Sequence, residues 1–141
     1  MPSFPIAFAK MSGTGNDFII IDNRRQVVPR EEQAELARRI CRRMFSVGAD
    51  GLILIEDSEV ADFSWQFYNA DGSVAEMCGN GSRCAARFAY RHGIAGAKMT
   101  FATLAGIIAA EIGADESQVK VRLTPPRDFR FDLALELGGK T

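Results

Sequence analysis

The stretch YNADGSVAEMCGNGSRC (residues 68–84) places Cys78 in a glycine-rich loop directly before a helix-forming sequence. A side chain at the N-terminus of a helix meets unpaired backbone N–H groups and the positive end of the helix dipole. These groups favour the thiolate form of a cysteine, and they also bind anions such as a carboxylate or a phosphate. We therefore expect an active site at this loop, with Cys78 as its nucleophile or base.

The other two cysteines fit the ordinary role of a buried thiol. Cys41 belongs to the apolar stripe of another predicted helix. Cys84 follows Cys78 by six residues, which is roughly 9 Å along a helix axis and too far for an undistorted disulfide. A metal site is not expected, because the cysteines lack paired spacing and His92 is the single histidine.

Hydrophobic periodicity along the chain predicts an α+β fold. One helix begins at Pro29, with apolar residues at Ala37, Ile40, Cys41 and Met44; a second, largely buried helix runs from Cys78 to about His92 and is capped by Gly93. Strands are predicted at residues 4–11, 18–22, 52–55, 62–68, 98–102, 107–112, 118–123 and 131–137. The pattern indicates many short strands around one buried helix.

Composition excludes several classes of protein. The 141 residues are 47% hydrophobic and 25% charged with a net charge of −1, which indicates one globular domain without a field that would attract nucleic acid or a membrane. The basic run at residues 38–43 is balanced by Glu31, Glu32 and Glu35, so a solvated helix face explains it. Three cysteines without a signal sequence predict free thiols and a cytoplasmic location.

Two further loops carry asparagines, and the amide of Asn16 suits binding of a small zwitterion. Asn16 follows Gly13-Thr14-Gly15, which lacks both the Lys-Ser/Thr of a P-loop and the third glycine of a dinucleotide fingerprint. Asn69 begins Asn69-Ala70-Asp71-Gly72, which alternatively reads as a tight turn without a function.

Taken together, these segments resemble the diaminopimelate epimerases, which are cofactor-independent amino-acid epimerases of bacterial lysine and cell-wall precursor synthesis. The matching residues are Lys10-Met11, Gly13, Gly15-Asn16-Asp17-Phe18, Gly48-Ala49-Asp50-Gly51, Asn69-Ala70-Asp71-Gly72-Ser73, Glu76-Met77-Cys78-Gly79-Asn80-Gly81, Arg83-Cys84, Arg87-Phe88, Thr103 and Gly106. They extend from about residue 8 to residue 106, and the match around Cys78 is highly specific.

The resemblance implies a site, a reaction and a fold. Such enzymes exchange the α-proton of the substrate between two cysteines, without pyridoxal phosphate or a metal. By position, Cys78 would be one of the two acid/base thiols, and the backbone N–H groups of Gly79 and Asn80 would hold the reacting carboxylate. Asn16 and Asn69 would bind the distal end of LL- or meso-diaminopimelate. The implied fold is a curved mixed β-sheet wrapped around a central buried helix.

The resemblance also implies a second domain that carries the second cysteine. We expect residues 1–141 to form the N-terminal domain, with about 1–123 as its body and 124–141 as a linker and first strand leading to the missing domain. Such a chain is expected to be inactive alone, and the resemblance leaves a homodimer open. Two alternatives remain: a related racemase or isomerase for proline-like or other substrates, and a non-catalytic module that binds a small carboxylate.

Overall fold

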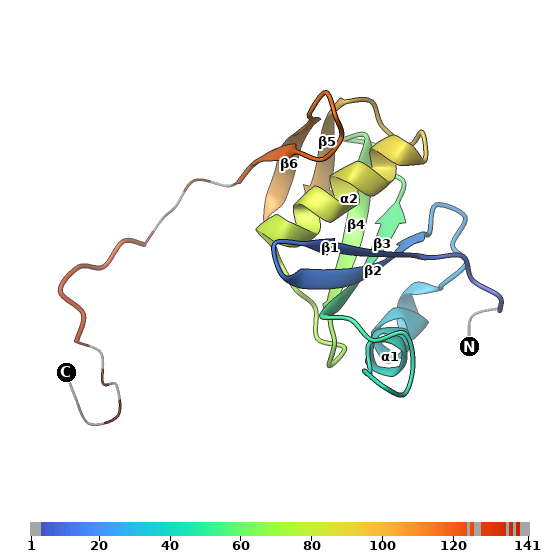
Figure 1. The fold of residues 1–141 in the computed structure, drawn as a ribbon, viewed down its shortest axis with the longest axis horizontal. Helices are drawn as coiled ribbons and strands as arrows, with labels where there is room; N and C mark the ends of the chain where they lie inside the picture. The colour runs from blue at the N-terminus through green and yellow to red at the C-terminus, as the bar shows by residue number, and fades with distance from the viewer. Residues whose placement is uncertain (1–3, 124, 126–127, 135, 137, 139–141) are drawn as a thin grey trace.

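The computed structural model describes residues 4–123, 125, 128–134, 136 and 138. In chain order its elements are β1 (Ala9–Gly13), β2 (Asn16–Asp22), α1 (Arg30–Ile40), β3 (Gly51–Glu56), β4 (Phe63–Asn69), α2 (Gly79–Arg91), β5 (Lys98–Thr103), β6 (Gly106–Ile112) and β7 (Val119–Arg122). The strands form one sheet in the order β1-β2-β3-β4-β5-β6-β7, and this sheet curls around α2 (Figure 1). The expected α+β fold, a curved mixed sheet around a central helix, is confirmed.

Neighbouring strands are connected either by short segments or by long segments that contain a helix. β1 and β2 form a hairpin whose two loop residues, Thr14 and Gly15, both have positive φ, at 50° and 93°. This is the primed turn that matches the twist of paired strands, and glycine adopts it without strain. The two long connections, β2 to β3 and β4 to β5, contain the helices and join parallel neighbours. The remaining neighbours are antiparallel.

The sheet has an apolar core on each face. Along β2, Phe18 and Ile20 face the cluster around α2, whereas Ile19 and Ile21 face the cluster around α1. All residues of β3 are buried, as expected for a central strand that is covered by a helix on both sides. A one-residue slip of β2 would exchange the two faces and move each set of side chains into the wrong core.

Helix α2 lies in the concave face of the sheet (Figure 1). Its small side chains Ala85, Ala86 and Ala89 are fully buried against that face, together with Cys84 and Phe88. The helix ends where predicted, with Gly93 at φ 68° just beyond the His92 cap. His92 stacks on the Phe88 ring, and its Nδ1 lies 2.9 Å from the Phe88 carbonyl, so it serves the end of the helix.

Helix α1 covers the opposite face but ends earlier than its apolar stripe predicted. Ala37 and Cys41 are buried, whereas Met44 is completely exposed with φ 70°, so its predicted place in the core is wrong. The chain reverses after Ile40, because the N–H groups of Gly48 and Ala49 return to donate to the Ile40 and Cys41 carbonyls at 2.8 and 3.2 Å. Those bonds satisfy the orphan carbonyls of the helix end.

Two predicted strands differ from the structure. β1 begins at Ala9, and not at residue 4, because only Ala9–Gly13 finds partners on β2. In the predicted strand 131–137, the described residues 131–134 and 136 are in no strand, and residues 135 and 137 lie outside the described part. Phe129, Phe131 and Leu133 are exposed. Figure 1 shows the segment 128–134 (red) apart from the sheet, and none of the described strands pairs with it.

Candidate active site

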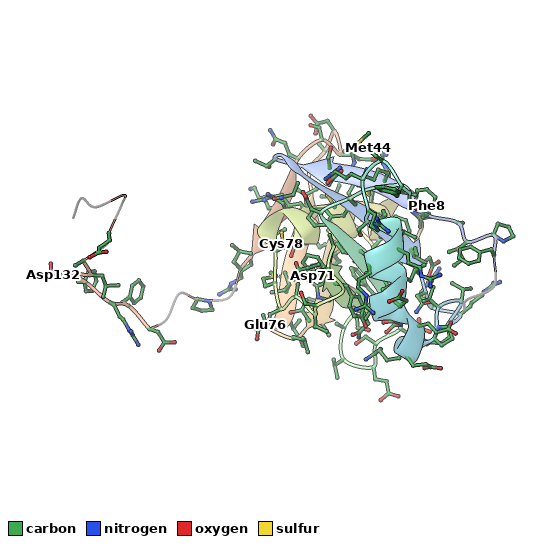
Figure 2. All side chains as sticks on the ribbon, turned by 90° about the horizontal axis from the view of Figure 1, so that it is seen from below. Phe8, Met44, Asp71, Glu76, Cys78 and Asp132 are labelled. Atoms are coloured by element: carbon green, nitrogen blue, oxygen red, sulfur yellow. The ribbon has the colours of Figure 1, made fainter. Side chains whose placement is uncertain are left out.

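Cys78 is the N-cap residue of α2. It has extended backbone angles, φ −149° and ψ 120°, and its Sγ accepts a hydrogen bond from the Gly81 N–H at 3.4 Å. The Cys78 carbonyl accepts the first helical bond from the Ser82 N–H at 2.8 Å. Figure 2 shows Cys78 at the end of the loop that carries Asp71 and Glu76 and leads into α2. The thiol is half-buried and therefore reachable from solvent.

The first turn of α2 is open for an anion. Within the described residues, no acceptor is hydrogen-bonded to the backbone N–H of Gly79 or Asn80. The first turn also contains no acidic residue that would neutralise the helix dipole. Unpaired N–H groups and an uncompensated positive end together favour a bound carboxylate. The structure thus brings Cys78, Gly79 and Asn80 together as consecutive parts of one site.

The structure joins this helix start directly to Asn16. The Asn80 Nδ2 donates to the Asn16 Oδ1 at 2.7 Å, although the two residues are 64 positions apart. The contact depends on Gly13, since a Cβ there would lie 3.3 Å from the Cys84 Sγ and 3.4 Å from the Asn80 carbonyl oxygen. Glycine at this position lets the β1–β2 hairpin approach α2 closely.

A charged network supports Asn16 from the other side. Its Nδ2 donates to the Asp50 Oδ2 at 3.1 Å, and the same carboxylate oxygen accepts the Asp17 N–H at 3.1 Å. Arg43 binds Asp17 through two bonds of 3.0 and 2.6 Å, and Lys10 lies 3.1 Å from the same carboxylate. The Arg43 guanidinium, and secondarily Lys10, hold the pKa of the Asp17 carboxyl well below its usual range.

Asn69 lies at the same edge of the sheet but is engaged locally. It pairs with Gly51 at the start of β3, and Gly51 pairs with Phe18 on β2. The Asn69 Nδ2 donates to the Ser73 Oγ at 3.0 Å, within the tight turn that the sequence also allowed. The neighbouring Ala70 N–H donates to the Asp50 carbonyl at 3.1 Å. Asn69 is therefore linked to the network through Asp50, and no direct bond between the side chains of Asn69 and Asn16 is observed in the described residues.

The two remaining cysteines are core residues, as predicted. Cys41 and Cys84 are 3% and 4% exposed, and all three thiols are free. Burial raises the pKa of Cys41 and of Cys84 to about 11. Neither thiol is suited to accept a proton near neutral pH.

Two hollows of the surface, of about 530 and 700 Å³, lie away from the start of α2, one over β5–β7 and one beside residues 22–29. Among the residues that the structure describes, no group of three or more His, Cys, Asp or Glu side chains could hold a metal ion. No helix in the described part of the chain is long and apolar enough to cross a membrane.

Sequence reasoning missed the role of Arg43, which it assigned to a solvated helix face. The residue lies beyond the end of α1, and its side chain is 57% exposed, yet it contacts both Asp17 and Asp50. Asp50 and Arg83 were noted only as parts of matching motifs, and the contacts that connect them to Asn16 and Asn80 follow from the fold. The sequence signal that could have indicated these contacts is the pair of acidic residues Asp17 and Asp50, each of which follows a glycine-containing segment and could pair with a nearby arginine.

Comparison with known proteins identifies the family of this chain. The family model described as diaminopimelate epimerase matches residues 8–128. A diaminopimelate epimerase from Aquifex aeolicus is 51% identical over 127 residues, and one from a Hydrogenobaculum species is 55% identical over 135 residues. These matches cover 84% and 90% of this chain but 46% and 48% of the relatives. The chain thus spans about half the length of the curated relatives that it matches.

Solved structures share the fold at low sequence identity. A methylitaconate-delta-isomerase has a TM-score of 0.66 at 20% identity, with 87% of this chain and 38% of that chain covered. A Bacillus anthracis protein of the PhzF family has a TM-score of 0.60 at 22% identity, covering 82% and 38%. At these identities the likeness concerns the fold alone. The family match over residues 8–128, together with the two close relatives, shows that the chain belongs to the diaminopimelate epimerase family.

Proposed function

We propose that this chain is the N-terminal half of an enzyme that interconverts LL- and meso-diaminopimelate without a cofactor, in the cytoplasm. The observation that carries the proposal is the start of α2, where a half-buried thiol caps a helix beside two open backbone N–H groups. This arrangement supports the assignment of a base beside a carboxylate site, and the family's curated relatives are named for this epimerisation.

The proposed reaction moves one proton off the α-carbon and returns another to its opposite face. Cys78, as thiolate, takes the α-proton, and the electron pair of the broken C–H bond moves toward the carboxylate. The N–H groups of Gly79 and Asn80 stabilise the negative charge that develops on the carboxylate oxygens. A second thiol then gives its proton to the opposite face of the carbon, and the roles of the thiols reverse in the other direction.

Recognition of the distal end is assigned to Asn16 and Asn69. Asn16 lies next to the helix start through its bond to Asn80. Asn69 occupies an exposed turn at the same sheet edge, where it is linked to Asp50. Amide side chains suit the second amino-acid group of diaminopimelate, because that group carries a carboxylate, which accepts hydrogen bonds, and an ammonium, which donates them.

The second thiol is assigned to a second domain that follows about residue 123. Cys41 and Cys84 are excluded as the second base by their burial and raised pKa values. The relatives are about twice as long as the region matched here, which leaves room for such a domain, with residues 124–141 leading into it. The chain alone therefore supplies one acid/base thiol, that of Cys78, and we expect it to turn over little or no substrate.

The test is α-proton exchange of diaminopimelate in D₂O, followed by NMR, with the full-length protein and its Cys78→Ala variant. Deuterium incorporation that disappears in the variant supports the proposal. The 141-residue chain is run in parallel, and full epimerisation by it alone would contradict the assignment of one thiol per half.

Other outcomes would point to the alternatives. If the full-length protein with reduced thiols exchanges proline-like substrates and not diaminopimelate, the racemase alternative replaces the proposal. If it exchanges nothing, and Cys78→Ala leaves the affinity for a small carboxylate intact, the binding module replaces it.

A further inference from the structure

A chain of hydrogen bonds with a single direction runs across the start of α2. Arg83 Nη1 donates to the Asn80 Oδ1 at 3.0 Å, and the Asn80 Nδ2 donates to the Asn16 Oδ1 at 2.7 Å. The Asn16 Nδ2 then donates to the Asp50 Oδ2 at 3.1 Å. The chain connects three segments that are far apart in the sequence: the β1–β2 hairpin, the entry to β3 and the first turn of α2.

The two charged ends leave the asparagine amides one orientation each. A guanidinium only donates hydrogen bonds, so the oxygen of Asn80 must face Arg83. A carboxylate only accepts them, so the nitrogen of Asn16 must face Asp50. With the ends fixed in this way, the oxygen of Asn16 meets the nitrogen of Asn80. If either amide rotated by half a turn, two donors or two acceptors would face each other at both of its contacts.

This orientation determines what the amides offer to a ligand. An amide nitrogen has two N–H groups, and each asparagine uses one of them in the chain. One N–H of Asn16 and one of Asn80 therefore have no acceptor among the described residues, close to the start of α2. Donors of this kind attract a carboxylate, whereas a flipped amide would present a carbonyl oxygen and repel it.

We propose that Arg83 and Asp50 are positioning residues, which fix the orientation of the Asn80 and Asn16 amides so that Asn80 presents an N–H group to the reacting carboxylate and Asn16 presents one to the carboxylate at the distal end of the substrate. Asp50 has a second link to the site, since its carbonyl accepts the Ala70 N–H beside Asn69 at 3.1 Å. Arg43 in turn supports Asp50 at 3.3 Å. The role in substrate binding rests on the proposed function; the fixed orientation of the amides does not.

The variants are Arg83→Gln and Asp50→Asn, whose amide side chains can donate or accept and so impose no direction. Arg83→Lys is the conservative rescue, because an ammonium also only donates. Arg91→Gln is the matched control: it removes the same charge from the same helix, at a residue that pairs with Glu116 at 3.4 Å. None of these changes removes an apolar core contact.

The first readout is NMR relaxation of the side-chain NH₂ groups of Asn16 and Asn80 in the 141-residue chain. We expect order parameters close to the rigid-backbone value of about 0.85 in the wild type, in Arg83→Lys and in Arg91→Gln. They should fall below about 0.6 in Arg83→Gln and Asp50→Asn. Rigid amides in Arg83→Gln, or the same loss in Arg91→Gln, would overturn the proposal.

The second readout is the kinetics of diaminopimelate exchange in the full-length protein. KM should rise about tenfold in Arg83→Gln and Asp50→Asn while kcat changes less than about threefold, as expected when binding interactions alone are lost. If the wild type exchanges diaminopimelate and these variants keep its KM, the positioning role in binding is overturned while the proposed function stands. If the wild type exchanges nothing but the amide relaxation responds as expected, the proposed function fails and the orientation of the amides is upheld.

Discussion

The two helices in the described part of the chain begin in opposite ways. α1 starts after Pro29, has no side-chain cap, carries Glu31 and Glu32 in its first turn, and ends with Arg38 and Arg39. These charges complement both ends of its dipole, which stabilises the helix by itself. α2 starts with a cysteine cap and has no acid in its first turn. The charges of α1 therefore stabilise the helix, whereas the positive end of the α2 dipole is left unneutralised at the candidate site.

The largest effect is expected from separating the capping role of Cys78 from its chemistry. Serine is a strong N-cap, so Cys78→Ser should keep the bond to the Gly81 N–H and change the free energy of unfolding by less than about 0.5 kcal/mol. Because a hydroxyl is a far poorer base than a thiolate, α-proton exchange in the full-length protein should fall about 1000-fold or more. NMR in D₂O and urea unfolding measure the two quantities.

Cys84→Ser is the control for removing a thiol from the same helix. It introduces a hydroxyl at a site that is 4% exposed and should cost about 1–3 kcal/mol of stability while leaving the exchange rate of the folded protein nearly unchanged. If Cys78→Ser retained the full rate of α-proton exchange, the Cys78 thiol would not be the catalytic base.

The next effect concerns the reactivity of the three thiols. With iodoacetamide at pH 7.5, Cys78 should be alkylated at least about 100-fold faster than Cys41 or Cys84, because the latter are buried and have pKa values of about 11. Peptide mass spectrometry of the native 141-residue chain gives the three rates. In urea the three rates should converge, because unfolding exposes all three thiols. If Cys84 reacted as fast as Cys78 in the folded chain, the distinction between an accessible capping thiol and a buried core thiol would be wrong.

A smaller effect is expected from giving α2 the acid that α1 already has. A side chain fits at Gly79, where a Cβ would lie 3.8 Å from Arg83 and 3.9 Å from Leu123. Relative to Gly79→Ala, Gly79→Asp should stabilise folding by about 0.5 kcal/mol through the dipole. It should also raise KM for diaminopimelate about tenfold, because the new carboxylate occupies the anion site.

Glu31→Gln is the matched change in α1. Removing this acid from the first turn should lower the free energy of unfolding by a similar 0.5 kcal/mol or so and leave KM unchanged. Equal effects of Gly79→Asp and Glu31→Gln on KM would mean that the two helix starts do not differ in function. Urea unfolding and exchange kinetics provide both values.

The smallest effect is a pH-dependent change in stability at the far end of α1. Arg43 holds the pKa of Asp17 below its ordinary value of 3.8. A depressed folded-state pKa stabilises the fold above that ordinary value, and the stabilisation is lost as the pH falls below it. Arg43→Met should therefore lower Tm by about 2–4 °C at pH 7, and the difference should shrink steadily as the pH falls below 3.8 toward the lower pKa of the folded state.

Arg42→Met is the control for this pH dependence. Arg42 lies 4.4 Å from the Phe45 ring centroid, and this contact does not depend on a carboxylate. Any Tm change in Arg42→Met should be similar at pH 3 and pH 7. If the Tm difference between the wild type and Arg43→Met stayed constant with pH, the role assigned to Asp17 would be contradicted.

Local sequence patterns are sufficient to predict the secondary structure and the helix start at which the candidate site lies. The two helices, the central strands and the cap at Gly93 follow from side-chain periodicity and from turn residues, which act over a few positions. Cys78 was found in the same way, because a thiol between glycines before a helix is a local signal. Met44 shows where periodicity fails as a predictor. The apolar spacing of the sequence extends the helix to Met44, whereas α1 ends at Ile40 and Met44 has a positive φ.

The contacts that support the candidate site, in contrast, follow from the tertiary fold. The contacts of Asn16 with Asp50, of Asn80 with Asn16 and of Arg43 with Asp17 join positions that are 26 to 64 residues apart. Such pairs form when the hairpin, the entry to β3 and the start of α2 meet at one edge of the sheet, and no local pattern encodes that meeting. The physical reason is that capping and periodicity depend on neighbours in sequence, whereas these hydrogen bonds depend on neighbours in space.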